Sequence, residues 1–69
     1  MIKEIKIKDE FIKLGQALKL AGAVDSGVEA KIIITEGKVS VNDEVCLMRG
    51  KKLYKGDLFS FDGNEFKIV

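Results

Sequence analysis

Four cationic side chains lie within seven residues of one another in the stretch MRGKKLYKGD: Arg49, Lys51, Lys52 and Lys55. The chain of 69 residues has a formal net charge of only +1, from 12 basic and 11 acidic side chains. Clustered cations can neutralise the phosphates of a nucleic acid, and each such contact releases counterions. A solvated connection between strands would have the same composition, so the stretch alone does not decide between the two interpretations.

The distribution of the other charges favours a binding face. Lys13, Gln16 and Lys19 are expected on the outer face of one helix, and Lys31 on that of a second helix. The acidic residues lie mainly at turns: Asp9, Glu10, Glu44, Asp57, Asp62 and Glu65. A nearly neutral chain can therefore present one positive face, which suits a polyanion.

Aromatic side chains, which can stack on unpaired bases, are few in this chain. Tyr54 is a candidate for stacking because it follows a pair of lysines, although packing explains it equally well. The four phenylalanines follow helical or alternating periods, which indicates that most of them are core residues. Recognition of a nucleic-acid backbone and its shape therefore fits better than base stacking.

The sequence offers few residues that could form a catalytic site or a metal site. Histidine is absent, which removes the commonest general base at neutral pH and the commonest metal ligand. The single cysteine, Cys46, stands in the apolar stretch VCLM and is expected to be a small core residue. The glycines form no phosphate-binding motif, and the acidic residues have no metal-ligand spacing. We therefore expect a protein that is not an enzyme and has no metal and no cofactor.

The first half of the chain predicts one strand and two helices. Residues 2–8 alternate, with Ile5 and Ile7 on one side, which indicates a strand. Asp9 is then expected to cap a helix that runs to Ala21 and stops at Gly22. Ser26 and Glu29 form a capping box for a second helix that ends at Gly37. Its apolar residues spread round most of the helical wheel, so we expect burial on two sides, with Gly27, Lys31 and Thr35 on one narrow exposed line.

The second half predicts two hairpins. KVSV and EVCL flank Asn42-Asp43, and DLFSF and EFKIV flank DGN, both suitable for tight turns. The basic stretch is expected to be a loop between the hairpins. The predicted fold class is α+β, a helix-turn-helix pair packed on a small antiparallel sheet, in the order β-α-α-β-β-β-β.

One domain over residues 1–69 accommodates all of these elements. No run of about 18 apolar residues is present and the N-terminus lacks a signal-peptide core, so we expect a cytoplasmic protein without a membrane partner. We also expect a monomer, because EFKIV, taken as the final edge strand, carries Glu65 and Lys67.

The stretch from Lys13 to Asp57 resembles the S4 RNA-binding domain, and more closely the small stand-alone bacterial proteins of the YbcJ type. The resemblance rests on LKLAG, SGVEAKIIITEGKVSVN and GKKLYKGD, in that order and spacing, over about two thirds of the chain. It implies a helix-turn-helix followed by a small β structure, known as an αL motif. It also implies a non-catalytic protein that binds structured RNA, either ribosomal or transfer RNA.

The resemblance carries over unevenly to individual positions. Lys13 precedes Leu14 as the family pattern has it, but Gly15 stands where a small acidic residue is frequent. Ser26, Glu29 and Ala30 match the second helix, whereas Gly27 replaces the usual Arg and could admit a phosphate to the helix N-terminus. Together, charge and resemblance give these candidate RNA-binding residues: Lys13, Gln16, Ser26, Gly27, Lys31, Lys38, Arg49, Lys51, Lys52 and Lys55.

Two alternative functions stay open from the sequence. A helix-turn-helix could bind DNA, but a recognition helix needs several polar side chains facing base edges, and the second helix offers few. The basic stretch could instead dock on an acidic protein. Lys6 and Lys8, on the first strand, are expected to lie outside the binding face.

Overall fold

The computed structural model describes residues 2–69 as two helices and two sheets. The strands and helices follow in the order β1 (Ile2–Ile5), β2 (Phe11–Lys13), α1 (Leu14–Leu20), α2 (Gly27–Thr35), β3 (Val39–Val41), β4 (Glu44–Val45), β5 (Lys52–Tyr54), β6 (Leu58–Phe61) and β7 (Asn64–Ile68). Five strands form one sheet in the order β1-β7-β6-β3-β4, and β2 pairs with β5 in a separate ribbon. The predicted α+β class is therefore confirmed.

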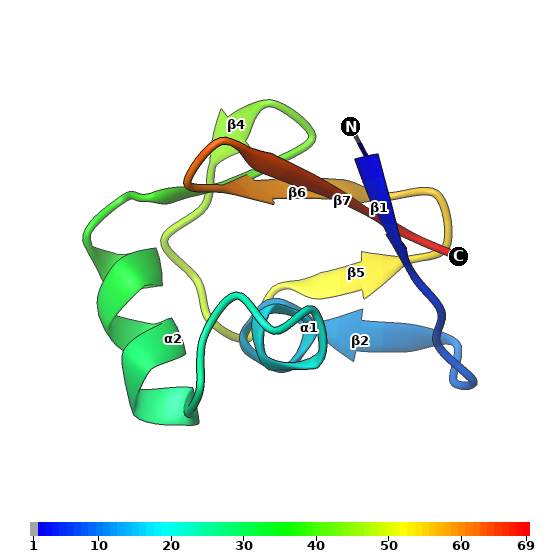
Figure 1. Cartoon of the computed structure of the whole chain (residues 1–69), viewed down its shortest axis with the longest axis horizontal. Coiled ribbons are helices and arrows are strands. Elements are labelled where there is room, and N and C mark those ends of the chain that lie inside the picture. Colours follow the sequence, from blue (N-terminus) through cyan, green and yellow to red (C-terminus); the bar gives the residue numbers. More distant parts are fainter. Residues whose placement is uncertain (1) are drawn as a thin grey trace.

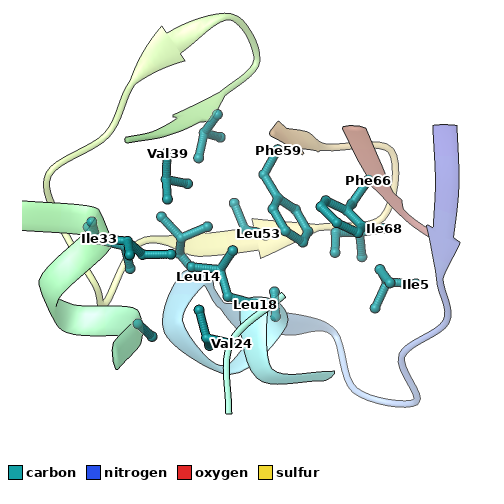
Figure 2. Packing of buried hydrophobic residues seen from close by; sticks show 14 of the residues in the cluster. Ile5, Leu14, Leu18, Val24, Ile33, Val39, Leu53, Phe59, Phe66 and Ile68 are labelled. Atoms are coloured by element: carbon teal, nitrogen blue, oxygen red, sulfur yellow. The ribbon is translucent and has the colours of Figure 1, made fainter. Parts of the chain in front are cut away.

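The molecule has two layers, with the five-stranded sheet on one side and the helix pair with the β2-β5 ribbon on the other (Figure 1). Side chains from both layers meet in a single core (Figure 2). The sheet contributes Phe59 and Phe66, whose rings stack with centroids 4.8 Å apart. Leu14 and Leu18 of α1 and Leu53 of β5 are fully buried against them. Burial of one such leucine contributes about 1.5–3 kcal/mol, so this contact fixes α1 and β5 beneath the sheet.

The local signals for the start of the second helix, for the C-terminal ends of both helices and for the hairpin turns are confirmed. The Ser26 hydroxyl oxygen accepts a hydrogen bond from the Glu29 N–H at 3.2 Å, which caps α2. Gly22 and Gly37 have positive φ angles of 76° and 77° and follow α1 and α2, each in a Schellman arrangement of backbone bonds. Asn42 and Asp43, with φ of 49° and 70°, make the tight turn between β3 and β4.

The predicted start of the first helix is wrong. Asp9 lies in a bend and caps nothing, and Phe11–Lys13 is a strand that pairs antiparallel with Lys52–Tyr54. Helix α1 begins only at Leu14, after Lys13, which makes no side-chain capping bond. The basic stretch is accordingly not one loop, because β5 runs through its middle. A pairing partner about 40 residues away overrides the local helical period, as tertiary context often does.

The sheet is mixed and not antiparallel throughout, as the sequence had predicted. Strand β1 pairs parallel with β7 from Ile2–Glu65 to Ile5–Ile68, while the other pairs are antiparallel. Strand β7 is therefore interior, and the expectation that EFKIV forms an edge is wrong. Ile5 and Ile7 are both buried, but the strand predicted over residues 2–8 ends at Ile5. Parallel pairing needs a long crossover, and here the intervening helices and strands provide it.

Helix α2 is buried on one side and not on two. Ala30, Ile33 and Ile34 face the core, whereas Val28 and Ile32 are 70% and 49% exposed. The α1-α2 pair packs together across a short connection, as expected for the helix-turn-helix. Within residues 2–69 no helix is long and apolar enough to cross a membrane.

Candidate nucleic-acid interface

The first part of the basic stretch is fixed to the N-terminus of α1 by backbone hydrogen bonds. The first N–H groups of a helix have no partner within the helix. Here the Leu14 N–H donates to the Lys51 carbonyl at 2.8 Å, and the Gly15 N–H donates to the Arg49 carbonyl at 3.1 Å. A further bond from the Lys51 N–H to the Met48 carbonyl, at 3.2 Å, closes the turn. Arg49 is therefore held at the start of α1.

Gly15 makes this close approach possible. A Cβ atom at this position would lie 2.9 Å from Cγ of Arg49 and 3.7 Å from its carbonyl oxygen. The side-chain stem of Arg49 thus passes directly over the first turn of α1. Gly15, where the family pattern often has an acidic residue, leaves room for this cation and removes a charge that would oppose a phosphate.

A shallow depression of about 330 Å³ opens beside this contact. Its walls come from α1, from the start of α2 and from the Arg49-Gly50 turn, and are formed by Lys13, Gly15, Gln16, Lys19, Gly27, Arg49 and Gly50. Four of the sequence-predicted site residues are among them: Lys13, Gln16, Gly27 and Arg49. Lys13, Lys19 and Arg49 supply three positive charges, and no acidic side chain lines the depression.

The N-terminus of α2 is open toward solvent. Ser26 is exposed but its hydroxyl oxygen is engaged with the Glu29 N–H, so its first role is to cap the helix. Gly27 has nothing within 4 Å of the place where a Cβ would stand. No packing contact therefore requires a glycine here. Lys31 is exposed one helical turn later, on the line with Gly27 that the sequence predicted.

The outer face of the β2-β5 ribbon carries two lysines and two aromatic rings. Lys13 pairs with Lys52 and Phe11 with Tyr54 in the antiparallel register, so these four side chains share one face. The Phe11 and Tyr54 ring centroids are 5.9 Å apart, and Lys52 Nζ lies 4.8 Å from the Phe11 centroid.

Phe11 is an exception to the prediction that most phenylalanines are core residues. This side chain is only half-buried on the ribbon, while Phe59 and Phe66 are buried as expected. The alternation of Phe11 with Lys13 and of Lys52 with Tyr54 is the sequence pattern that could have predicted the two strands of the ribbon. A helical period through the same residues concealed it.

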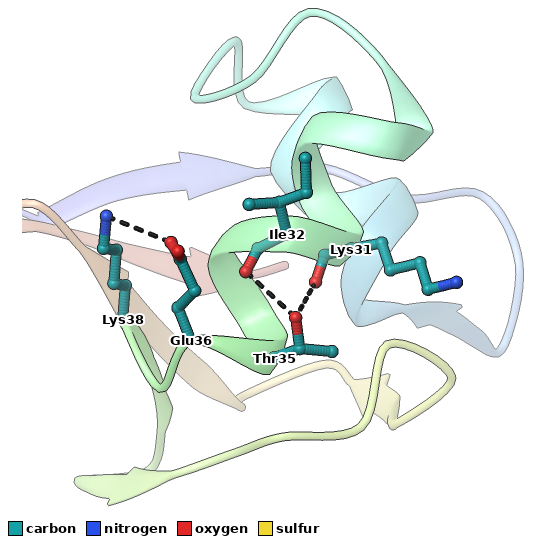
Figure 3. Close-up of polar contacts among 5 residues, drawn as sticks. All are labelled: Lys31, Ile32, Thr35, Glu36 and Lys38. Carbon is teal, nitrogen blue, oxygen red and sulfur yellow. Dashed lines mark hydrogen bonds and ion pairs between the residues drawn. The ribbon is translucent and has the colours of Figure 1, made fainter.

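Six predicted residues do not line the depression: Ser26, Lys31 and Lys52, described above, and Lys38, Lys51 and Lys55. Lys38 lies beyond the C-terminus of α2, where its Nζ is 3.2 Å from a carboxylate oxygen of Glu36, and Figure 3 shows Lys31 extending away from this ion pair. Lys55 follows β5, so the whole of this strand separates it from Arg49. Lys51 lines a different hollow, together with Leu47 and Met48.

Asp57, at the end of the basic stretch, has a structural role. One carboxylate oxygen accepts from the Tyr54 N–H at 2.8 Å, which closes the turn after β5. The other lies 3.4 Å from the Asn42 side-chain amide, in the turn between β3 and β4. Asp57 thus fixes the ribbon relative to the sheet, as is typical of Asp in turns.

Comparison with known proteins agrees with this architecture. The solution structure of YbcJ from Escherichia coli, described as having an αL motif involved in RNA binding, superposes with a TM-score of 0.73 at 34% identity, over 96% of this chain and 85% of that one. "Probable ribosome maturation protein RlbA" of Bacillus subtilis (strain 168) is 46% identical over 100% of this chain and 99% of its own length. "Putative RNA-binding protein YbcJ" of Escherichia coli (strain K12) is 37% identical over 90% of this chain and 89% of its length. The S4 domain model matches residues 5–69, and the chain belongs to the S4 domain family.

Proposed function

We propose that this chain is a non-catalytic protein that binds structured RNA through the depression and the adjoining outer face of the β2-β5 ribbon. The observation that carries the proposal is the convergence of Lys13, Lys19 and Arg49 beside the open N-terminus of α2. Within residues 2–69 the only ion pair is Lys38–Glu36, so these three cations are free to neutralise phosphates. A helix N-terminus adds a favourable dipole for an anion.

The relatives favour RNA as the polyanion, and ribosomal RNA as its class. YbcJ bears a name that describes RNA binding, and RlbA bears one that describes ribosome maturation. RlbA is 46% identical over the whole chain, so a shared role in ribosome maturation is the more specific form of the proposal. We expect crosslinking in living cells, followed by sequencing, to recover ribosomal RNA in preference to transfer RNA.

DNA reading by α2 is disfavoured by what this helix exposes. Val28 and Ile32 are apolar and exposed, and the Thr35 hydroxyl donates to the carbonyls of Lys31 and Ile32, with oxygen distances of 2.9 and 3.1 Å. Lys31 is left as the main polar group on this face. A recognition helix in the major groove needs more hydrogen-bonding side chains than this.

Binding titrations over a range of salt concentrations test the proposal. The wild-type protein should bind an RNA hairpin more tightly than duplex DNA of the same sequence. In the double variant Lys13→Gln, Arg49→Gln, loss of two phosphate contacts should reduce the salt slope by about 1.4–1.8. Lys67→Gln, an exposed lysine on β7, is the control and should change little.

Equal affinity for RNA and DNA would overturn the proposal and leave a general polyanion binder. Loss of RNA binding by Lys67→Gln but not by the double variant would place the interface elsewhere. Binding to an acidic protein, with no RNA binding at any salt concentration, would support the protein-docking alternative.

A further inference from the structure

A second concavity of about 570 Å³ adjoins the depression on the other side of α1. It lies between α1 and the segment that joins β1 to β2, and we refer to it as the α1 groove. Its apolar lining includes Phe11, Ile12 and Leu20, and we refer to these residues as the floor. Its lining also includes the cations Lys6, Lys8 and Lys19, which we refer to as the rim. An apolar floor with a charged rim is the composition that a small ligand site needs.

The floor of the α1 groove is accessible. Leu20 is 59% exposed, and Phe11 and Ile12 are half-buried. The Phe11 ring is held in position by Tyr54 and by the ammonium group of Lys52, as measured on the ribbon. A ring that is already fixed loses little conformational entropy when a planar group packs against it. A nucleobase is such a group, and base stacking on aromatic side chains tolerates any sequence.

The rim suits the phosphates on either side of such a base. Lys6, Lys8 and Lys19 are exposed, and none of them makes an ion pair within residues 2–69. The sequence had placed Lys6 and Lys8 outside the binding face, but the structure brings both next to Lys19. Asp9 is the one acidic side chain that lines the groove, and its carboxylate could accept a hydrogen bond from an exocyclic amine of a base.

The α1 groove adjoins the depression, because Gln16 and Lys19 line both. An RNA backbone that follows the cations of the depression would therefore reach the groove without leaving the protein surface. A fully paired base cannot enter a side pocket, whereas a bulged or looped base can be splayed out of its stack.

We propose that the α1 groove takes the base of one unpaired nucleotide in the structured RNA. The apolar floor with Phe11 lies against the base, and Lys6, Lys8 and Lys19 neutralise the flanking phosphates. This inference rests on the proposed function, since it places the unpaired nucleotide within the same RNA. It gives the protein a preference for RNA with a single unpaired position, independent of sequence.

Three RNA hairpins that differ at one position test the inference. The first is fully paired, the second has a bulged adenosine, and the third has an abasic residue at the bulge. The wild-type protein should bind the adenosine bulge at least about fivefold more tightly than the abasic bulge. Phe11→Leu keeps an apolar side chain but removes the ring, and should reduce this preference to less than about twofold.

Two further variants keep the result interpretable if Phe11→Leu alters the ribbon. Leu20→Ala trims an exposed side chain of the groove floor and should reduce the preference in the same direction. Val28→Ala trims another exposed apolar side chain, on α2 and outside the groove lining, and should leave the preference unchanged. Thermal unfolding should show that all variants are folded.

The outcomes separate this inference from the proposed function. Equal binding of adenosine and abasic bulges by the wild-type protein, or a preference retained in both groove variants, would overturn the inference alone. Failure to bind any of the three hairpins would instead overturn the proposed function on which it rests.

Discussion

At the scale of single residues, the contact between Gly15 and Arg49 determines where one cation of the interface stands. The Arg49 stem lies over the first turn of α1 because Gly15 has no side chain. The Arg49 carbonyl also accepts the Gly15 N–H, so backbone and side chain are positioned together. The proposed interface therefore depends on the absence of a side chain at Gly15 as well as on the charges that are present.

Gly15→Ala should reduce the affinity for RNA with little change in the stability of the fold. The new Cβ would lie 2.9 Å from Arg49 Cγ, so the arginine stem must move away from the depression. Alanine is favoured over glycine by about 0.8–1.0 kcal/mol in a helix interior, and a smaller gain in the first turn of α1 offsets part of the strain. RNA affinity should fall severalfold while the unfolding midpoint changes little. A variant that unfolds readily but binds normally when folded would show that Gly15 serves packing only.

Gly27→Arg should increase RNA affinity. The family pattern commonly has Arg at this position, and the space around Gly27 is open, so the longer side chain would meet no obstacle. One added phosphate contact should raise the salt slope by about 0.7–0.9. Titrations against the same hairpin would measure this, with Gly27→Gln as the uncharged control. No gain in affinity would mean that RNA does not pass the N-terminus of α2.

At the scale of elements, β5 divides the basic stretch into parts with different surroundings. Arg49 is bound to the start of α1, Lys52 lies on the ribbon over Phe11, and Lys55 follows the strand. Cations that are neighbours in the sequence therefore do not act as one cluster.

Lys51 and Lys52 should contribute unequally to binding. Lys52 shares the outer ribbon face with Lys13, whereas Lys51 lines the hollow formed with Leu47 and Met48. Lys52→Gln should reduce the salt slope by about 0.7–0.9, and Lys51→Gln should reduce it by less. The loss of the cation–π contact should also cost Lys52→Gln about 0.5–1 kcal/mol in stability at this exposed site. A larger effect of Lys51→Gln on RNA affinity would mean that RNA crosses the opposite side of the turn.

At the scale of the whole molecule, the basic surface and the sheet edges lie on different elements. The basic surface is formed by α1 and the β2-β5 ribbon, whereas the edges belong to the large sheet. The edge strands of the large sheet are β1 and β4, while β7 is interior. Strand β4 has only two residues, and β1 carries Lys3 and Glu4. Short or charged edges discourage pairing between copies.

We accordingly expect the protein to be a monomer, although the reason differs from the one the sequence suggested. Light scattering at micromolar concentration should give the mass of a single chain. The same mass should be found with Lys3→Gln, because β4 and the remaining charge of Glu4 still block association. A dimer in the wild-type protein would show that exposed apolar residues such as Val45, Leu47 and Met48 bury one another between copies.

The sequence by itself determined the features that depend on a few neighbouring residues. The Ser26 cap, the glycines after both helices and the two tight hairpin turns all depend on residues within five positions of one another, so local patterns identify them. The resemblance of its motifs also pointed to the S4 family, and the comparisons confirm this membership.

The tertiary structure alone decided which distant segments lie together. The β2-β5 ribbon and the parallel β1-β7 pair join residues about 40 and 63 positions apart, and no local period encodes such a pairing. These two pairings left Phe11 half-buried on the ribbon, outside the fully buried core, and brought Lys6 and Lys8 beside α1. They arise because the hydrophobic stabilisation is largest when the apolar sides of both layers are buried in one shared core. That burial depends on the whole chain and not on any local segment.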